Sequence, residues 1–249
     1  MSMEEEKKSR TLLNKAGVAL FALLFLLACV FGVYVSVYYH ANSVAVEAMN
    51  AASIDGDKHY VFAAQGGEAQ EQVGLVIYPG AKVEASAYAP LAQAVAQRGI
   101  TCVICPMPFN MAFFDVDSLD DVIADHPEIT HWYLAGHSLG GAMGAIHASE
   151  HASELDGLVL LAAYSTKDLS NTHLKVLSVY GSEDQVLSRE KYEGSRTNLP
   201  ENALELVIQG GNHAGFAGYG PQDGDGEASI SPEEQIAQTA DAIQRLAAA

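Results

Sequence analysis

The feature that most constrains the fold of this chain is a glycine-flanked serine between an apolar run and a run of small residues. Residues 132–135 read Trp-Tyr-Leu-Ala, and residues 136–140 read G-H-S-L-G, which matches G-x-S-x-G. This context predicts a buried strand, a sharp turn and then a helix. The turn lifts the hydroxyl of Ser138 clear of the sheet and aims the backbone N–H of Leu139 outward from the helix N-terminus. Ser138 is therefore the candidate nucleophile, and the Leu139 N–H is a candidate oxyanion donor.

Predicted strands alternate with predicted helices over most of the chain. Apolar runs predict strands at 59–64, 73–78, 100–105, 131–135, 158–162, 174–180 and 204–208. Helical periodicity covers 86–97, 118–125, 139–150, 188–197 and 233–246. We expect a doubly wound, mostly parallel α/β sheet with helices on both faces. The connection between 158–162 and 174–180 is short, so we expect minimal or no cap domain.

Two residues after the later strands complete a candidate catalytic set. A serine hydroxyl becomes an effective nucleophile when a histidine takes its proton and a carboxylate orients the histidine. Asp184, in Y-G-S-E-D after strand 174–180, is the candidate acid, with Glu183 as the alternative. His213, in the glycine-rich loop after strand 204–208, is the candidate base.

The loop after strand 73–78 is the expected source of a second oxyanion donor. It reads Y-P-G-A-K, and the N–H of Ala81 follows a turn that Gly80 permits. Lys82 is a candidate substrate contact through its positive charge, with an ordinary solvated loop lysine as the alternative. His137 precedes the serine and points the wrong way for a base. We expect it to pack beside the substrate pocket or to line it.

Four motifs taken together resemble those of a known family. They are Y-P-G-A-K-V-E at 78–84, G-H-S-L-G-G at 136–141, Y-G-S-E-D at 180–184 and G-G-N-H-A-G-F at 210–216. The set resembles the small α/β-hydrolases of bacteria, in particular the group described as dienelactone-hydrolase-like, over residues 58–249. The resemblance implies a cofactor-free Ser-His-Asp hydrolase of carboxylic esters, with nucleophile, acid and histidine in that chain order.

The resemblance has a limit at the nucleophile. Dienelactone hydrolases use a cysteine where this chain has Ser138, so their substrate is not carried over. The alternative function is a non-catalytic binding domain on the same fold, because a fold does not fix a function. The substrate that we expect is a small-molecule ester.

The N-terminal region predicts a membrane anchor. Residues 17–39 carry no charge and are long enough to cross a bilayer core of ~30 Å. Basic residues precede them at positions 7, 8, 10 and 15, so the positive-inside rule keeps 1–16 in the cytoplasm and puts 40–249 outside. Residues 40–57 are expected to be a linker and 58–249 the hydrolase domain. Lipidation at Cys29, in L-L-A-C, and a cleaved signal peptide are the alternatives.

The remaining patterns concern partners and metals. The net charge of -18 argues against a nucleic-acid partner. Residues 147–151 match the zinc motif H-x-x-E-H, but no third ligand is evident, so no metal is predicted. Residues 223–234 resemble a calcium loop, and a helix capping box at 231–234 is the alternative. Residues 107–125 form an unusually apolar connection, either packed in the core or folded over the site as an acyl pocket.

Overall fold

The computed structural model describes residues 3–55, 58–65 and 72–249 and divides into two compact units. The first, Met1–Val37, contains a single helix, α1 (Met3–Ser36). Within it, Asn14–Ser36 has a mean hydropathy of 2.8 and enough length to cross a membrane. Length and composition alone make this stretch a candidate span, and a signal sequence has the same properties.

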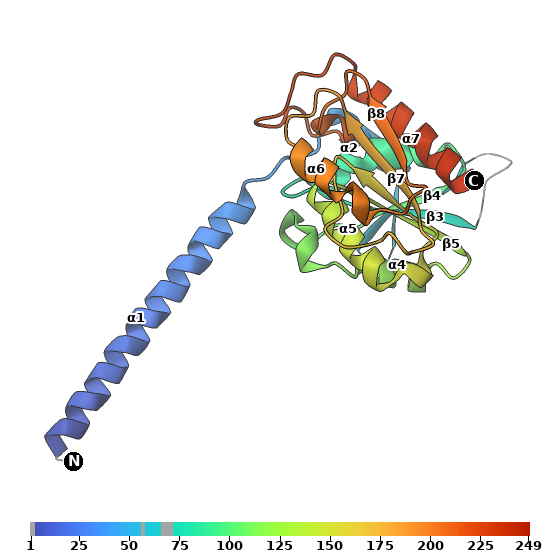
Figure 1. Cartoon of the computed structure of the whole chain (residues 1–249). Coiled ribbons are helices and arrows are strands. Elements are labelled where there is room, and N and C mark those ends of the chain that lie inside the picture. The colour runs from blue at the N-terminus through green and yellow to red at the C-terminus, as the bar shows by residue number, and fades with distance from the viewer. Residues whose placement is uncertain (1–2, 56–57, 66–71) are drawn as a thin grey trace. The chain divides into compact units, whose positions relative to one another are not determined.

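The second unit, Tyr38–Ala249, is built on one sheet, whose described part has eight strands in the order β1-β2-β4-β3-β5-β6-β7-β8 (Figure 1). The strands are β1 (Ser53–Asp55), β2 (His59–Phe62), β3 (Val73–Tyr78), β4 (Thr101–Ile104), β5 (His131–His137), β6 (Gly157–Leu161), β7 (Lys175–Gly181) and β8 (Leu204–Ile208). β2 pairs antiparallel with β1 and with β4, and all other neighbours are parallel. The prediction of a mostly parallel α/β sheet is confirmed.

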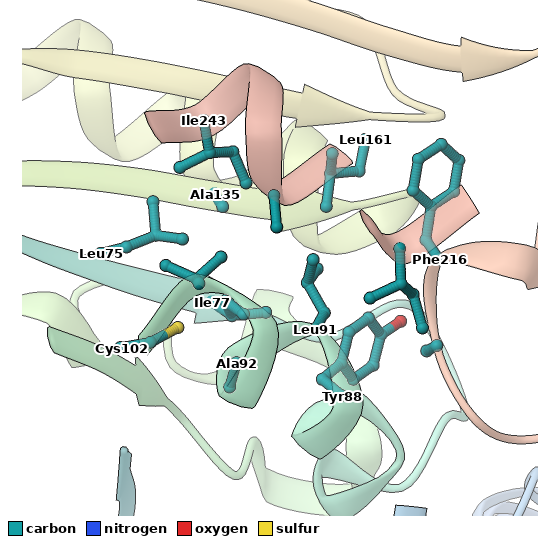
Figure 2. Packing of buried hydrophobic residues seen from close by; sticks show 14 of the residues in the cluster. Leu75, Ile77, Tyr88, Leu91, Ala92, Cys102, Ala135, Leu161, Phe216 and Ile243 are labelled. Carbon is teal, nitrogen blue, oxygen red and sulfur yellow. The ribbon is translucent and has the colours of Figure 1, made fainter. Parts of the chain in front are cut away.

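Helices cover both faces of the sheet. They are α2 (Ser43–Ala48), α3 (Ala89–Ala96), α4 (Ser118–Asp125), α5 (Leu139–Glu150), α6 (Arg189–Ser195) and α7 (Pro232–Ala248). Successive side chains of β3 point to opposite faces, so Leu75 and Ile77 join the core beneath α3 and α7 (Figure 2). Val76 and Tyr78 join the second core, beneath α4 and α5. The two cores explain why β3 reads as a continuous apolar run.

The strand register brings the loops of interest to one edge of the sheet. Tyr78 at the end of β3 pairs with Gly136 near the end of β5, and His137 pairs with Leu161 at the end of β6. Gly181 at the end of β7 pairs with Ile208 at the end of β8. Loops at the carboxyl ends of parallel strands form the usual site crevice of such sheets. No helix occurs between β6 and β7, so there is no cap domain there.

Residues 40–55, which fall in the predicted linker, contain regular structure. The expected linker contains α2 and β1, which belong to the second unit. Ala45 of α2 is fully buried, and Asn42 caps this helix by accepting the Ala45 N–H at 3.0 Å. Tyr39 lies beyond the end of α1, and its ring centroid is 5.4 Å from that of Tyr219. These elements are too short to give a periodic sequence signal, and their packing partners are distant in sequence.

Candidate active site

Ser138 occupies a strained turn between β5 and α5. Its backbone lies at φ 52° and ψ -118°, a region that residues with a side chain seldom adopt. The turn is tight because Gly136 and Gly140 approach neighbouring backbone atoms. A Cβ on Gly140 would overlap the carbonyl group of Tyr78, and one on Gly136 would overlap the backbone of Gly140. The local sequence therefore forces the geometry that the G-x-S-x-G pattern predicts.

His213 and Asp184 form a buried pair. His213 Nδ1 lies 2.9 Å from Asp184 Oδ2, and the two side chains are 2% and 0% exposed. The other oxygen, Oδ1, accepts the backbone N–H groups of Val186 at 2.9 Å and Leu187 at 2.8 Å. A carboxylate with three donors around it is held in one orientation, and it fixes the imidazole with Nδ1 as the protonated nitrogen.

The alternative acid, Glu183, is not part of this pair. It is exposed, and its Oε1 accepts a hydrogen bond from the hydroxyl of Ser182 at 2.9 Å. Of the two neighbouring carboxylates, the structure therefore brings Asp184, and not Glu183, to His213.

Ser138 and His213 line one cavity of ≈ 350 Å³. The cavity wall is made of mostly small and apolar side chains, namely Leu139, Ala142, Ala162, Ala163, Tyr164, Val186 and Leu187, together with Ser188 and Lys191. His213 Nε2 is buried and has no hydrogen-bond partner among the described residues. The ring nitrogen that a general base needs is thus left for a group entering this cavity.

The loop after β3 is held from three sides. The Gly80 N–H donates to the hydroxyl of Tyr88 at 2.9 Å. Lys82 has φ 57°, its N–H donates to the Asn110 carbonyl at 2.8 Å, and its own carbonyl accepts the Tyr39 N–H at 2.7 Å. Ala81 and Lys82 are not among the residues that line the cavity. The backbone of Lys82 joins three segments, and its predicted contact with substrate stays a prediction.

His137 is buried rather than facing the cavity. Its Nδ1 lies 2.7 Å from the hydroxyl of Tyr88, and its Nε2 lies 3.0 Å from the carbonyl oxygen of His213. Because the Tyr88 oxygen already accepts the Gly80 N–H, its hydrogen is available for His137 Nδ1, and Nε2–H then donates to His213. Burial, with His213 close by, lowers the pKa of His137 well below 6.5 and keeps the ring neutral.

These contacts are those of a packed side chain, which is one of the two arrangements expected for His137. Both of its ring nitrogens are engaged by protein groups, so neither is left for a substrate. We therefore propose His137 as a positioning residue that links the loop after β3 to the loop carrying His213. The sequence identifies the residue but not its partner, because Tyr88 lies on a separate element.

Asp225 holds the loop that carries His213, whereas the sequence suggests it as a calcium ligand. Its Oδ1 accepts the N–H of His213 at 3.2 Å and that of Gly226 at 2.8 Å. Its Oδ2 accepts the N–H of Ala214 at 2.9 Å. The carboxylate that was a candidate calcium ligand therefore fixes the histidine loop.

The capping alternative for residues 231–234 is observed. Ser231 Oγ accepts the Glu234 N–H at 3.2 Å, and Pro232 is the first residue of α7. The hydrogen bonds of Asp225 and Ser231 thus give these two residues of the 223–234 segment structural roles that do not require calcium.

The apolar connection at 107–125 is partly packed in the core and partly exposed. Met107 and Met111 are buried in the core beneath α4 and α5 or beside it. Phe109, Phe113 and Phe114 are 52%, 47% and 44% exposed, and their rings contact one another. None of the three lines the ≈ 350 Å³ cavity. The segment is anchored by its methionines and presents its aromatic side chains to the exterior.

The comparisons with known proteins identify the family. The chain matches the model of the alpha/beta hydrolase family over residues 74–237. It belongs to the alpha/beta hydrolase family. None of the curated proteins compared with the chain matches it. The family match confirms both the resemblance drawn from the four motifs and the predicted fold.

Three of the solved structures that are similar to this hydrolase cover most of its chain. Est1E from Butyrivibrio proteoclasticus has a TM-score of 0.59 and 12% identity, covering 80% of this chain and 98% of that chain. Naproxen esterase from Bacillus subtilis has a TM-score of 0.55 and 12% identity, covering 80% and 94%. A membrane phospholipase A, described as a bacterial virulence factor, has a TM-score of 0.58 and 13% identity, covering 91% and 98%. At these identities the likeness shows the fold alone.

Proposed function

We propose that this alpha/beta hydrolase is a serine hydrolase of carboxylic esters that works through an acyl-enzyme. The observation that carries the proposal is the buried His213–Asp184 pair, joined at 2.9 Å, whose histidine lines the same cavity as the strained Ser138. A structural histidine would have both ring nitrogens satisfied, as His137 does. In His213 only Nδ1 has a hydrogen-bond partner among the described residues. Nε2 has none there, and such a ring nitrogen can take a proton from a nucleophile.

The mechanism follows from these positions. Ser138 Oγ attacks the ester carbonyl while His213 Nε2 takes its proton, and Asp184 stabilises the resulting imidazolium through Nδ1–H. His213 then protonates the leaving alcohol as the tetrahedral intermediate collapses to the acyl-enzyme. In the second half, water loses a proton to His213 and attacks the acyl group, and Ser138 regains its proton.

Two backbone N–H groups are proposed to hold the oxyanion. That of Leu139 is the first in α5, so it has no intrahelical acceptor and lies at the positive end of the helix dipole. That of Ala81 makes no hydrogen bond within the part of the chain that the structure describes. Loss of one such donor typically lowers kcat by about 10²- to 10³-fold.

The cavity supports a short acyl chain as substrate. Its volume of ≈ 350 Å³ is near the lower end of the range for small-molecule sites, roughly 300–1,000 Å³. Ala162 and Ala163 contribute little apolar depth, and no helix from residues 162–174 covers them. Lys191 is the one lining residue with an ammonium group, which favours esters that carry a negative charge away from the reacting carbonyl. Two similar structures, Est1E with bound ferulic acid and naproxen esterase, are in keeping with this substrate class.

We also propose that α1 anchors the hydrolase with its second unit outside the cytoplasm. The warrant is the apolar Asn14–Ser36 stretch, with basic residues before it at positions 7, 8 and 10 and a further one, Lys15, at its start. Protease added to intact cells should then degrade the second unit. Complete protection until lysis would contradict the orientation. A second unit that is released from the membrane would indicate a cleaved signal peptide instead of the anchor. A lipid attached to Cys29 would indicate the lipoprotein alternative.

Ester hydrolysis by the full chain in detergent tests the function. We expect turnover of p-nitrophenyl acetate and butyrate, with kcat/KM falling toward the dodecanoate, and only background hydrolysis by Ser138→Ala. Absence of turnover on every ester would favour the non-catalytic binding domain. Values of kcat/KM that rise steadily to the dodecanoate would instead show that the exposed phenylalanines of the 107–125 connection form an acyl tunnel.

A further inference from the structure

A cluster of histidines and carboxylates lies where the last turn of α5 meets the first turn of α4. His147 is in the last turn of α5, and His151 immediately follows this helix. Asp117 precedes α4 and Asp120 lies in its first turn. Residues about thirty positions apart in sequence are thus brought to one place, and none of them lines the cavity of Ser138.

Three of these side chains have the mutual spacing of metal ligands. One ligand atom each from Asp117, His147 and His151 lies within 4.8 Å of the other two. Donor atoms around a tetrahedral zinc with bonds of about 2.0–2.1 Å are about 3.3 Å apart. Small side-chain rotations would bring the three ligand atoms to this spacing. The two imidazole rings are already nearly parallel, with an interplanar angle of 9° and centroids 4.6 Å apart. The third ligand that the H-x-x-E-H pattern lacks is therefore supplied by Asp117.

His147 provides an independent sign that the cluster is incomplete without a ligand. Its side chain is 0% exposed, its Nδ1 lies 3.2 Å from Asp117 Oδ1, and its Nε2 has no hydrogen-bond partner among the described residues. Nε2 lies 3.7 Å from Asp120 Oδ1, beyond hydrogen-bond distance. A buried polar atom without a hydrogen bond is costly, and a bound cation would remove that cost.

We propose that Asp117, His147 and His151 bind one zinc ion, with Asp120 as the neighbouring fourth donor. Imidazole nitrogens favour zinc over calcium or magnesium, which prefer all-oxygen sites, and a mixed set of histidine and carboxylate suits tetrahedral zinc. The C-terminal end of α5 also carries the negative end of the helix dipole, which attracts a cation. Bound there, the ion ties α4 to α5 and stabilises the fold without entering the ester chemistry.

Zinc titration of the full chain tests the site. The protein is purified in detergent with a tag that contains no histidine, stripped with a chelator, and titrated with zinc chloride by calorimetry. We expect one zinc ion per chain and an unfolding temperature that rises when zinc is added. Asp117→Asn and His151→Ala replace side chains that are not fully buried, so both variants should fold and should bind zinc at least 10-fold more weakly.

The matched control is His131→Ala. His131 is an exposed histidine whose Nδ1 lies 3.3 Å from Asp156, so it resembles the cluster locally, but it belongs to neither group of described residues that could hold a metal ion. This variant should bind zinc as the wild type does. The proposal is overturned if the wild type binds no zinc, or if Asp117→Asn and His151→Ala keep wild-type zinc affinity. In those cases His147 is not a metal ligand.

Discussion

The two ends of α5 carry different chemistry on one helix. At its N-terminal end, Ser138 and Leu139 line a cavity, in a turn that Gly136 and Gly140 make possible. At its C-terminal end, His147 and His151 lie among carboxylates from other elements. In the roles proposed above, the first end offers backbone donors to a developing negative charge and the second offers lone pairs to a cation, as the helix dipole favours at each end.

The comparison also shows which sites a sequence can reveal. The N-terminal site is encoded largely in five consecutive residues, 136–140, because the geometry of the turn is local. The C-terminal cluster depends on Asp117, whose proximity to His147 is created only when α4 and α5 pack together. A local motif predicts the first, and tertiary structure alone assembles the second.

The largest effect that separates the two ends should come from Ser138→Ala and His213→Ala. Each should lower kcat by roughly 10⁵-fold or more, and the double variant should be little worse, because such residues act as a unit. Zinc affinity at the other end of α5 should stay at its wild-type value. Steady-state kinetics and zinc calorimetry on the same preparations measure both. Near-wild-type turnover in either single variant would remove the catalytic assignment.

The next effect concerns the acid. Asp184→Asn should lower kcat by about 10⁴-fold, because an amide can hold the imidazole in the wrong tautomer. Glu183→Gln, the matched neighbour, changes an exposed side chain that does not contact His213 and should leave kcat close to wild type. The two variants are compared by kcat on one short-chain ester. The opposite ranking would transfer the acid role to Glu183.

A smaller effect tests the link behind the N-terminal site. Tyr88→Phe removes the hydroxyl between Gly80 and His137, leaving a buried N–H unpaired at a cost of about 1–3 kcal/mol in the free energy of unfolding. We also expect kcat to fall about 10-fold, since the loop carrying Ala81 loses an anchor. Tyr192→Phe is the control, because its hydroxyl bonds Ser178 and Glu205 away from the cavity. It should lower stability and not kcat. An unchanged kcat in Tyr88→Phe would reduce the link to a stability feature.

The smallest effect is a pH dependence of stability that comes from His137. Burial lowers the pKa of His137 well below 6.5 in the folded protein, whereas the unfolded chain takes up a proton near that value. The free energy of unfolding should therefore fall as the pH drops below 6.5, by up to about 1.4 kcal/mol per pH unit. His137→Gln should reduce this slope in denaturant unfolding curves. Equal slopes in wild type and His137→Gln would show that the ring is protonated when folded.

The fold was predictable where the signal is local and repeated. The strands Val73–Tyr78 and Leu204–Ile208 and the helices Ser118–Asp125 and Leu139–Glu150 have the predicted bounds. The sheet order was not predicted, because neither hydropathy nor periodicity says that β4 lies between β2 and β3. β1, the edge strand next to β2, was not predicted either, because its residues fall in the expected linker.

The candidate site shows the same division. The order of Ser138, Asp184 and His213 along the chain follows from their motifs, and the structure adds the contact between the last two. The partners of His137 and Asp225 could not be predicted, because each bond joins loops that only the finished sheet brings together. The local sequence does not show that His137 is buried, or that the carboxylate of Asp225 accepts several backbone N–H groups.

Covalent labelling tests the central claim, that the N-terminal end of α5 carries an activated serine. The full chain in detergent is treated with a fluorophosphonate probe, and the modified peptide is located by mass spectrometry. We predict one adduct, on Ser138, with labelling lost in Ser138→Ala, strongly slowed in His213→Ala and unaffected by chelators. Absence of labelling in folded wild type, or an adduct on another serine, would contradict the account.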